Sequence, residues 1–187
     1  MGKILQLRVQ LAEIKPAIWR EFIVSDFWTF EKLHKIIQKV MGWENYHLYE
    51  FNVNGVKIGS VDEDVDYELK NSKVEQIWKY IDEEKQKFHY LYDFGDSWEH
   101  EITVKKINED NPENRVCPSC ISGERACPLE DCGGTSGYER IVEVLKNKEK
   151  FSDEDSKELL EWAGDWEPER IDVDEINREL KKHAGFG

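Results

Sequence analysis

The sequence predicts an α+β fold with a mostly antiparallel sheet built from hairpins, one helix after the first two strands, and a C-terminal group of helices. Three observations lead to this prediction. Segments with alternating apolar and polar residues dominate the chain up to residue 107 and are separated by short turn signals. Apolar residues at helical spacing follow the second of these segments and recur from residue 136 onward. Strands therefore come mainly first and helices last, which is typical of an α+β domain.

The first two strands are predicted at residues 3–14 and 17–24, with Pro16 between them. The first strand has one apolar face, and the second is expected to pair with it in the antiparallel direction. Thr29 is the predicted N-cap of a helix that ends at Gly42. The apolar residues of this helix recur at the spacing of a core-facing stripe: Phe30, Leu33, Ile36, Ile37, Val40 and Met41.

A hairpin is predicted next, because residues 46–53 and 56–60 flank the turn signal Asn54-Gly55. The stretch that follows, residues 61–72, is acidic and is expected to be a loop. Residues 73–81 are predicted to form a short helix, since their apolar side chains recur at helical spacing.

Residues 87–94 and 97–107 predict a longer hairpin that turns at Gly95-Asp96. A two-residue turn at this dipeptide would place Asp93 and His100 on one face as diagonal neighbours. That face would also hold His89, Leu91, Trp98, Ile102 and Val104, and the opposite face would hold Tyr90, Tyr92, Phe94, Glu99 and Glu101. A buried carboxylate needs a partner, and two interpretations remain open. The pair either fixes the register of the hairpin, or is an Asp-oriented histidine that acts as a general base or metal ligand.

In the last third of the chain, three polar residues are predicted to begin helices: Ser136, Ser152 and Asp172. Ser136 forms a predicted capping box with Glu139, and Asp172 with Glu175 is predicted to start the last helix. Gly164 is expected to stop the second of these helices. Neither an internal repeat nor a low-complexity linker interrupts the sequence, so residues 1–187 are predicted to form a single domain.

The charge of the chain excludes some classes of partner. The formal net charge is −14 and the isoelectric point is about 4.9. Direct nucleic-acid binding is not expected, because it rests on Lys and Arg that neutralise phosphates, and an anionic membrane surface is disfavoured for the same reason. The sequence has neither a signal-peptide core nor an apolar run of the ~18 residues that a membrane span needs. We therefore expect a cytoplasmic protein whose partner is an unknown protein or a small anionic ligand.

All four cysteines lie in one predicted loop at residues 116–135, with the spacing C-x2-C-x6-C-x4-C. Zinc prefers four ligands in a tetrahedron, and thiolates serve well. We therefore predict a structural zinc clip formed by Cys117, Cys120, Cys127 and Cys132. Reduced thiols that are simply packed are a second interpretation, and a disulfide or redox pair is a third. A site closed by four thiolates would be structural and not catalytic.

Polar residues of the same loop also have two interpretations. They form salt bridges within the loop and cap the following helix, or they present a basic side chain and backbone amides to an anionic ligand near a helix N-terminus. The candidate ligand-binding residues are Arg125, Glu130, Asp131, Gly133 and Gly134. Elsewhere in the chain, His34 and His47 are predicted to be core or surface residues and not ligands.

Three stretches of the sequence match a known pattern. They are KPAIWREFIVSDFWTFEKLHKIIQKVMGWENYHLYEF at residues 15–51, FHYLYDFGDSWEHEI at 88–102 and CISGERACPLEDCGGTSGY at 120–138. Together they resemble the plasmid pRiA4b ORF-3-like family, whose members typically read PPIWRR, LHxxIQxxMGW, HLHxF, YxYDFGDxWxH and GxRACPPEDCGG in this order. The resemblance spans nearly the whole chain. It implies a compact α+β domain and no particular biochemical activity, and some members are labelled as passengers of mobile elements associated with resolvases.

The chain departs from this pattern at several positions. Ala17 replaces the second residue of the usual double proline, and Glu21 stands where a second arginine is usual. Tyr49 stands where the second histidine of HLH is usual, so a role for that histidine does not carry over. Cys117 is extra to the pattern.

Three functions follow as hypotheses. The acidic composition and the closed cysteine set favour the first, a non-enzymatic binding or adaptor module with a structural zinc clip. The second is a hydrolase-like enzyme that uses Asp93 and His100, with Arg125 or Glu130 beside them. The third is an accessory protein of a mobile element, which the labels on similar proteins suggest. A deep pocket at His100 would favour the enzyme, whereas a filled core there would exclude it.

Overall fold

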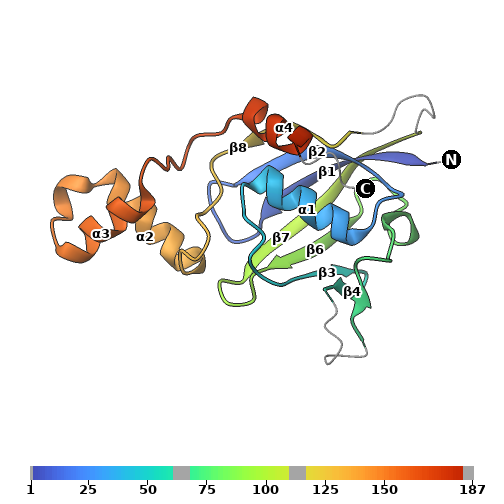
Figure 1. Ribbon diagram of the computed structural model, residues 1–187, viewed down its shortest axis with the longest axis horizontal. Helices are drawn as coiled ribbons and strands as arrows, with labels where there is room; N and C mark the ends of the chain where they lie inside the picture. Colours follow the sequence, from blue (N-terminus) through green and yellow to red (C-terminus); the bar gives the residue numbers. More distant parts are fainter. Residues whose placement is uncertain (1, 61–67, 110–116, 183–187) are drawn as a thin grey trace.

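The computed structural model describes residues 2–60, 68–109 and 117–182 of the chain. In this part of the chain, eight strands form one sheet in the order β5-β4-β3-β6-β7-β1-β2-β8 (Figure 1). The strands are β1 (Lys3–Leu11), β2 (Trp19–Ser25), β3 (Tyr49–Val53), β4 (Val56–Gly59), β5 (Lys70–Asn71), β6 (Lys87–Tyr92), β7 (Trp98–Glu109) and β8 (Ser119–Glu124). Neighbouring strands pair in the antiparallel direction, except that β4 and β5 run parallel. The predicted fold class is confirmed.

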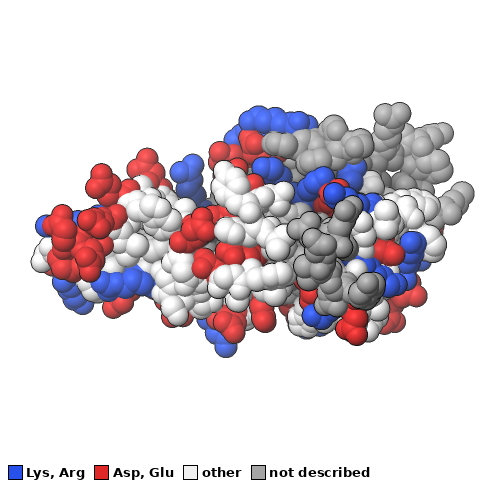
Figure 2. All heavy atoms as spheres, turned by 60° about the horizontal axis from the view of Figure 1, so that its bottom comes forward, with Lys and Arg blue, Asp and Glu red and all other residues white. Residues whose placement is uncertain are grey.

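The helices cover one face of the sheet and extend beyond it. They are α1 (Phe30–Met41), α2 (Gly134–Lys146), α3 (Glu154–Ala163) and α4 (Val173–Lys182), with the 3-10 turns η1 (Ile77–Lys79) and η2 (Lys148–Lys150). Helix α1 lies across the sheet and α4 packs beside it against β8, whereas α2 and α3 project away as an arm (Figure 1). Carboxylates gather on this arm and over the middle of the molecule (Figure 2). Among the described residues, every helix is too short or too polar to cross a lipid bilayer.

The main core lies between α1 and the covered face of the sheet. Alternation along β1 directs four apolar side chains into this core, where the apolar stripe of α1 meets them. Its completely buried members include Leu5, Leu7, Val9, Phe22, Leu33, Ile36, Ile37 and Phe51. Burial of each such side chain stabilises the fold by about 1.5–3 kcal/mol relative to exposure. Gln6, Arg8 and Glu21 lie partly exposed on the opposite face.

Several local signals act as predicted. Oγ1 of Thr29 accepts the N–H of Lys32 at 3.3 Å, and Gly42 ends α1 in the left-handed conformation with φ 92°. Asn54 and Gly55 also have positive φ, at 52° and 84°, as a tight hairpin turn between β3 and β4 requires. The first helix and the first short hairpin therefore follow from residues adjacent in the sequence.

Helix α2 begins earlier than predicted. It starts at Gly134 and not after Ser136, and Gly133 is its N-cap without a side-chain hydrogen bond of its own. The N–H of Gly133 instead donates to Oδ2 of Asp96, from the turn between β6 and β7, at 3.1 Å. The predicted capping box is wrong, because the carboxylate that accepts from this helix start comes from a segment distant in the sequence.

The remaining predicted helices differ in detail. Helix α3 begins after Asp153, one residue later than predicted, and the side chain of Asp153 accepts the N–H of Ser156 at 3.0 Å. Asp172 caps α4 as predicted, by accepting the N–H of Glu175 at 2.8 Å. Residues 73–81 contain the 3-10 turn η1 in place of the predicted short α-helix.

The hairpin of β6 and β7 has a longer turn than predicted. Residues 93–97 form the loop, and Tyr92 pairs with Trp98 across it. The pairing is therefore shifted by one residue, which turns every side chain of β6 to the other face. The assignment of His89 and Leu91 to the core face is wrong. The buried face contains Phe88, Tyr90, Tyr92, Trp98, His100, Ile102 and Val104.

Candidate metal centre

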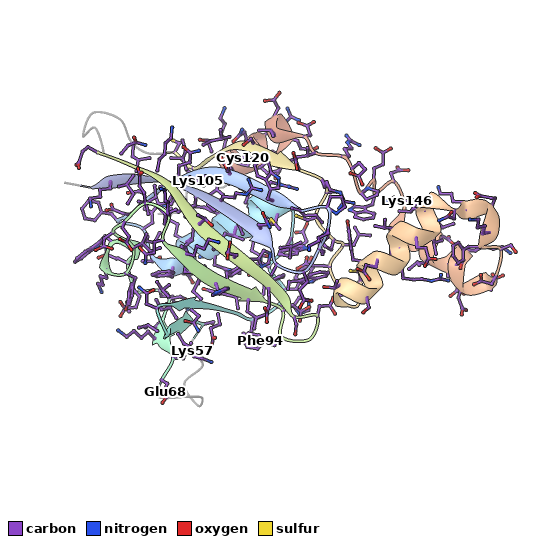
Figure 3. All side chains as sticks on the ribbon, turned by 180° about the vertical axis from the view of Figure 1, so that it is seen from behind. Lys57, Glu68, Phe94, Lys105, Cys120 and Lys146 are labelled. Carbon is purple, nitrogen blue, oxygen red and sulfur yellow. The ribbon has the colours of Figure 1, made fainter. Side chains whose placement is uncertain are left out.

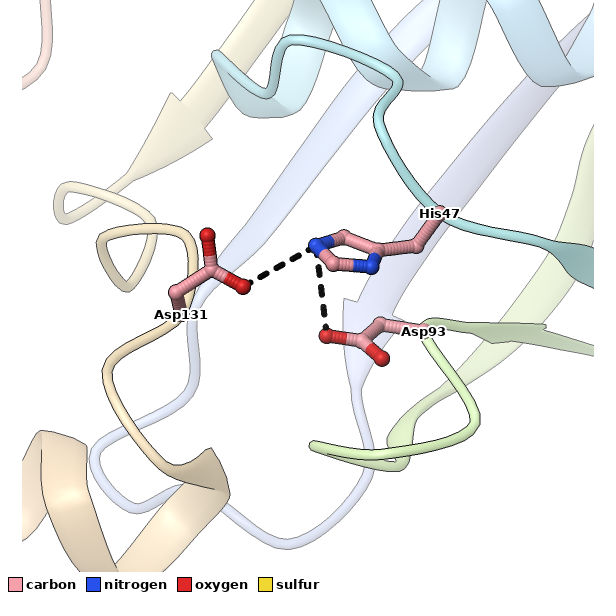
Figure 4. Close-up of side chains that lie close together, drawn as sticks. All are labelled: His47, Asp93 and Asp131. Atoms are coloured by element: carbon pink, nitrogen blue, oxygen red, sulfur yellow. Dashed lines mark ion pairs between the residues drawn. The ribbon is translucent and has the colours of Figure 1, made fainter.

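One histidine and two aspartates from separate segments meet at one end of the sheet. His47 comes from the loop between α1 and β3, Asp93 from the end of β6, and Asp131 from the loop before α2 (Figure 4). Nε2 of His47 lies 3.1 Å from Oδ1 of Asp131 and 3.6 Å from Oδ2 of Asp93. One ligand atom of each residue lies within 4.8 Å of the other two, and no other such group occurs among the described residues.

The loop that carries His47 is held by side chains beneath it. Asn45 has a left-handed φ of 63°, and its Oδ1 lies 2.6 Å from Nε2 of the buried His34. The N–H of Tyr46 donates to the hydroxyl of Tyr92 at 3.1 Å. The imidazole of His47 then packs edge-on against the ring of Tyr92, with centroids 5.9 Å apart. The position of His47 is thus set by the two residues before it and by the ring of Tyr92.

Asp93 is held by its own turn. It has φ 55°, its N–H donates to the carbonyl of Leu48 at 3.0 Å, and its carbonyl accepts the N–H of Ser97 at 2.7 Å. Oδ1 accepts the N–H of Gly95 at 2.9 Å. Oδ2 is therefore the oxygen that faces His47, and the side chain is only 10% exposed.

Asp131 belongs to a loop that docks onto the end of α1. Nε1 of Trp43 donates to the carbonyl of Pro128 at 3.0 Å, and Oε2 of Glu130 accepts the N–H of Glu44 at 2.7 Å. These bonds fix the backbone on the N-terminal side of Asp131. Its own side chain is 68% exposed, so the cluster is open to solvent on this side.

A close backbone approach fixes the other side of this loop. A Cβ atom on Gly134, whose φ is 67°, would lie 2.8 Å from the carbonyl oxygen of Asp96. Glycine at this position therefore lets the start of α2 reach the turn between β6 and β7. The bond from Gly133 to Asp96 forms at the same place. The amide of Gly133 is thus occupied by the chain's own carboxylate and not presented to an external anion.

The electrostatic setting of the cluster has two unusual features. Nε2 of His47 is buried and makes no well-aligned hydrogen bond, although two carboxylate oxygens lie close to it; buried polar atoms are normally bonded. Next to it, burial and then the hydrogen bond and charge of Glu130 raise the pKa of Tyr92. Tyr92 therefore stays protonated and donates to Glu130. Nε2 of His47 therefore has no hydrogen-bond partner in the described part of the chain and is free to coordinate a cation.

His100 does not belong to the cluster. It is completely buried, its Nδ1 lies 3.2 Å from the carbonyl oxygen of Tyr90, and its Nε2 has no hydrogen-bond partner. The ring packs against Trp43, with centroids 5.3 Å apart. Burial lowers the pKa of His100 to about 4, so the ring is neutral. The predicted pairing of His100 with Asp93 is wrong, because the shift in register separates them and a filled core surrounds His100.

The four cysteines do not gather in the described part of the chain. No three of Cys117, Cys120, Cys127 and Cys132 bring their sulfurs within 4.8 Å of one another. The physical reason is that residues 119–124 form β8, and an extended strand does not curl the first pair around one ion. Cys120 lies on this strand, away from Phe94 at the β6–β7 turn beside the cluster (Figure 3).

The thiols themselves are suited to packing. Burial raises the pKa of Cys127 to about 11 and that of Cys132 to about 12, so both stay protonated. Sγ of Cys127 lies 3.5 Å from the sulfur of Met41 in the core. This arrangement lacks the geometry of a four-thiolate clip, and the zinc content of the purified protein stays a prediction.

Arg125 is committed to internal contacts. It is 7% exposed and binds both carboxylate oxygens of Glu169, at 2.9 and 2.8 Å, while Nη1 donates to the carbonyl of Pro16 at 2.8 Å. Among the predicted ligand-binding residues, Asp131 lies in the cluster and Glu130 borders it. Sequence reasoning missed His47, although this residue occupies the place of the first histidine in the HLHxF pattern.

Comparison with known proteins gives a family and two relatives. The sequence model of the family described as Plasmid pRiA4b ORF-3-like protein matches residues 3–175. The Uncharacterized protein y4hQ of Sinorhizobium fredii (strain NBRC 101917 / NGR234) is 32% identical over 182 residues, which cover 95% of this chain and 91% of that protein. The crystal structure of a protein of unknown function, MM3350 from Methanosarcina mazei Go1, has a TM-score of 0.82 and 35% identity, and the match covers 93% of this chain and 97% of that one.

Proposed function

The chain belongs to the plasmid pRiA4b ORF-3-like family, and because its relatives are described only as uncharacterised or of unknown function, we propose from its own geometry that it is a metal-binding protein. It holds one divalent transition-metal ion on His47, Asp93 and Asp131. The observation that carries this proposal is the convergence of three ligand atoms within 4.8 Å, from three separately anchored segments.

The spacing of the ligand atoms suits a small ion. Zinc binds histidine nitrogen and carboxylate oxygen at about 2.0–2.2 Å, so two ligands at the corners of a tetrahedron lie about 3.3–3.4 Å apart. The distances of 3.1 and 3.6 Å from Nε2 of His47 to the two carboxylate oxygens bracket this value. Little movement of the side chains is therefore needed to admit an ion. A bound ion would also give the buried Nε2 of His47 the partner that neither carboxylate oxygen provides.

The ligand set also limits the kind of ion. One imidazole with two carboxylates suits Zn²⁺ or Mn²⁺, whereas Mg²⁺ prefers oxygen ligands alone. Two carboxylates balance the charge of a divalent ion, so the site is neutral overall when filled. Oδ1 of Asp93 keeps its bond from the N–H of Gly95, a group that would not touch the ion itself but orients the carboxylate.

Metal titration of the chelator-treated protein tests this proposal. Calorimetry with Zn²⁺ and Mn²⁺ is expected to give one ion per chain. The variants His47→Asn and Asp131→Asn are expected to weaken binding by at least about 100-fold, since even outer-sphere partners contribute about 10–100-fold. His89→Asn is the matched control, because His89 is exposed on β6 and faces away from the cluster. Equal affinity in His47→Asn and His89→Asn would exclude the site.

A cysteine variant separates this site from the predicted zinc clip. Replacement of both Cys117 and Cys132 by serine is expected to leave metal stoichiometry unchanged, because neither thiol belongs to the cluster. If zinc is lost in the cysteine variant and kept in His47→Asn, the ion is held by the cysteines and the proposal for the His47 cluster is wrong.

Metal-dependent hydrolysis is a second candidate function, favoured by the 68% exposure of the Asp131 side chain. Three protein ligands with a position open to water are the arrangement of catalytic zinc sites. An ion held by His47, Asp93 and Asp131 would supply a Lewis acid that lowers the pKa of water and provides a nucleophile near neutral pH. Turnover of nitrophenyl acetate or nitrophenyl phosphate by the metal-loaded protein, abolished in His47→Asn, is the expected result. Metal binding without turnover of either substrate would leave a binding protein and remove the hydrolase.

A further inference from the structure

A groove separate from the metal cluster runs between α1 and the C-terminal part of the chain. Its volume is about 570 Å³, within the range of about 300–1,000 Å³ that is usual for ligand pockets. The end of α1, residues 126–130 and the stretch 165–179 line it. The groove therefore joins segments that are far apart in the sequence.

The floor of this groove is apolar. Met41 comes from α1, Pro128 and Leu129 come from the loop before α2, and Ile171 and Ile176 come from around the start of α4. The indole of Trp166 also lines the groove, and its N–H donates inward to a backbone carbonyl at 2.9 Å. Its ring is thus available for apolar contact and needs no polar partner.

The rim of the groove is acidic. Seven carboxylate residues and three basic residues line it. Among the described residues, five of these carboxylates form no ion pair. Glu130 accepts hydrogen bonds from the N–H of Glu44 and the hydroxyl of Tyr92, and the other four are Glu44, Asp165, Glu167 and Glu175. Glu44, Asp165, Glu167 and Glu175 are also exposed. Four unpaired carboxylates around one apolar groove favour a positively charged occupant.

One of the three basic residues is not available to pair with the rim carboxylates. Arg20 is 3% exposed, and its guanidinium donates to the carbonyls of Val40, Trp19, Glu124 and Arg125 at 2.7–3.0 Å. It therefore ties the strand β2 to α1 and to the loop after β8. Lys39 and Arg170 remain as the basic residues of the rim.

We propose that this groove docks a basic segment of a partner protein, in which apolar side chains alternate with Lys or Arg. The apolar residues of such a segment would cover the floor, and its cations would meet the unpaired carboxylates of the rim. The net charge of −14 adds long-range attraction for a basic partner. An oligonucleotide or an anionic lipid surface would be repelled by the same rim. This inference does not depend on the metal site.

Fluorescence anisotropy of the full chain with a labelled peptide of alternating lysine and leucine tests the proposal. The double variant Glu44→Lys, Glu167→Lys is expected to weaken binding by about tenfold or more at low ionic strength, and salt is expected to weaken binding to the native chain. Glu99→Lys is the control, because Glu99 is an exposed carboxylate of β7 that does not line the groove. All three residues are exposed, and thermal melting of each variant checks that it is folded.

Two comparison peptides complete the test. A peptide in which glutamate replaces lysine is expected not to bind, and one in which glutamine replaces leucine is expected to bind more weakly by about tenfold or more. The proposal is overturned if Glu99→Lys weakens binding as much as the groove variant, or if the lysine–glutamine peptide binds as well as the lysine–leucine peptide. It is also overturned if no binding occurs up to about 1 mM.

Discussion

Replacement of Gly134 by alanine tests the close approach that holds the Asp131 loop in place. At φ 67°, an alanine costs about 1–2 kcal/mol for the left-handed conformation alone. Its Cβ would also lie 2.8 Å from the carbonyl oxygen of Asp96, which is backbone and cannot rotate away. Relief of this clash separates α2 from the turn and breaks the bond from Gly133 to Asp96, a further loss of about 1–2 kcal/mol. We expect a total loss of about 3 kcal/mol in the free energy of unfolding.

The matched control is Gly42→Ala. Gly42 also has a positive φ, of 92°, but a Cβ there would meet no atom within 4 Å. The φ of Gly42 lies further than that of Gly134 from the range of about 50–70° that other residues tolerate. The conformational cost of alanine at Gly42 is therefore at least as large as at Gly134. Urea unfolding is expected to show about 1–2 kcal/mol for Gly42→Ala, and metal affinity is expected to fall only in Gly134→Ala. Equal losses of stability in the two variants, with metal affinity unchanged in both, would refute the idea that this contact positions Asp131.

Two further predictions concern pH and thiol reactivity. Burial lowers the pKa of His34 and of His100 from 6.5 to about 4. Below pH 6.5 the unfolded chain therefore binds protons at these histidines that the folded chain does not bind. The free energy of unfolding falls as the pH drops from about 6.5 to about 4, by at most about 3 kcal/mol for each histidine. Urea unfolding at pH 7 and pH 5 measures this loss of stability. The difference in the free energy of unfolding between the two pH values should be smaller in His100→Leu and unchanged in the exposed control His89→Asn. An unchanged difference in His100→Leu would contradict the lowered pKa of His100. With Ellman's reagent on the native protein, the exposed Cys117 is expected to react fast and the buried Cys120 and Cys127 slowly, so that Cys117→Ser removes the fast phase. If all four thiols are protected until a chelator is added, the result would instead support the predicted zinc clip.

Features encoded by adjacent residues could be predicted from the sequence. Thr29 and Gly42 mark the ends of α1 because each acts on backbone groups within one turn of it. Asn54-Gly55 sets the first hairpin because both residues tolerate positive φ. The alternation along β1 identified its buried face for the same reason, since the period of a strand is fixed by its backbone.

The second hairpin shows where such local rules fail. Asp93 and Ser97, which are not glycines, both adopt positive φ, at 55° and 56°, and the Asp93 side chain accepts the N–H of Gly95. This self-capped turn is longer than the two residues that Gly95-Asp96 predicts. The error of one residue moved Tyr90 to the wrong face, and it gave Asp93 the wrong histidine as a partner.

The cluster itself could not be derived from spacing along the chain. His47 reaches Asp131 only because the loop before α2 docks on the end of α1, through contacts such as Trp43 to Pro128. The cysteine spacing was misleading for a related reason. The strand β8 is recruited by pairing with β2, a tertiary contact that overrides the compact loop expected around Cys120.

The loop before α2 connects the two proposed sites. Pro128 and Glu130 line the groove, and Glu130 also accepts bonds from Glu44 on the groove side and from Tyr92 on the cluster side. Asp131, the next residue, faces His47. We therefore expect an occupant of the groove that shifts Glu130 to shift Asp131, the most exposed of the three proposed ligands, as well. Linkage then requires that the ion change the affinity of the groove by the same factor as the occupant changes the affinity for the ion.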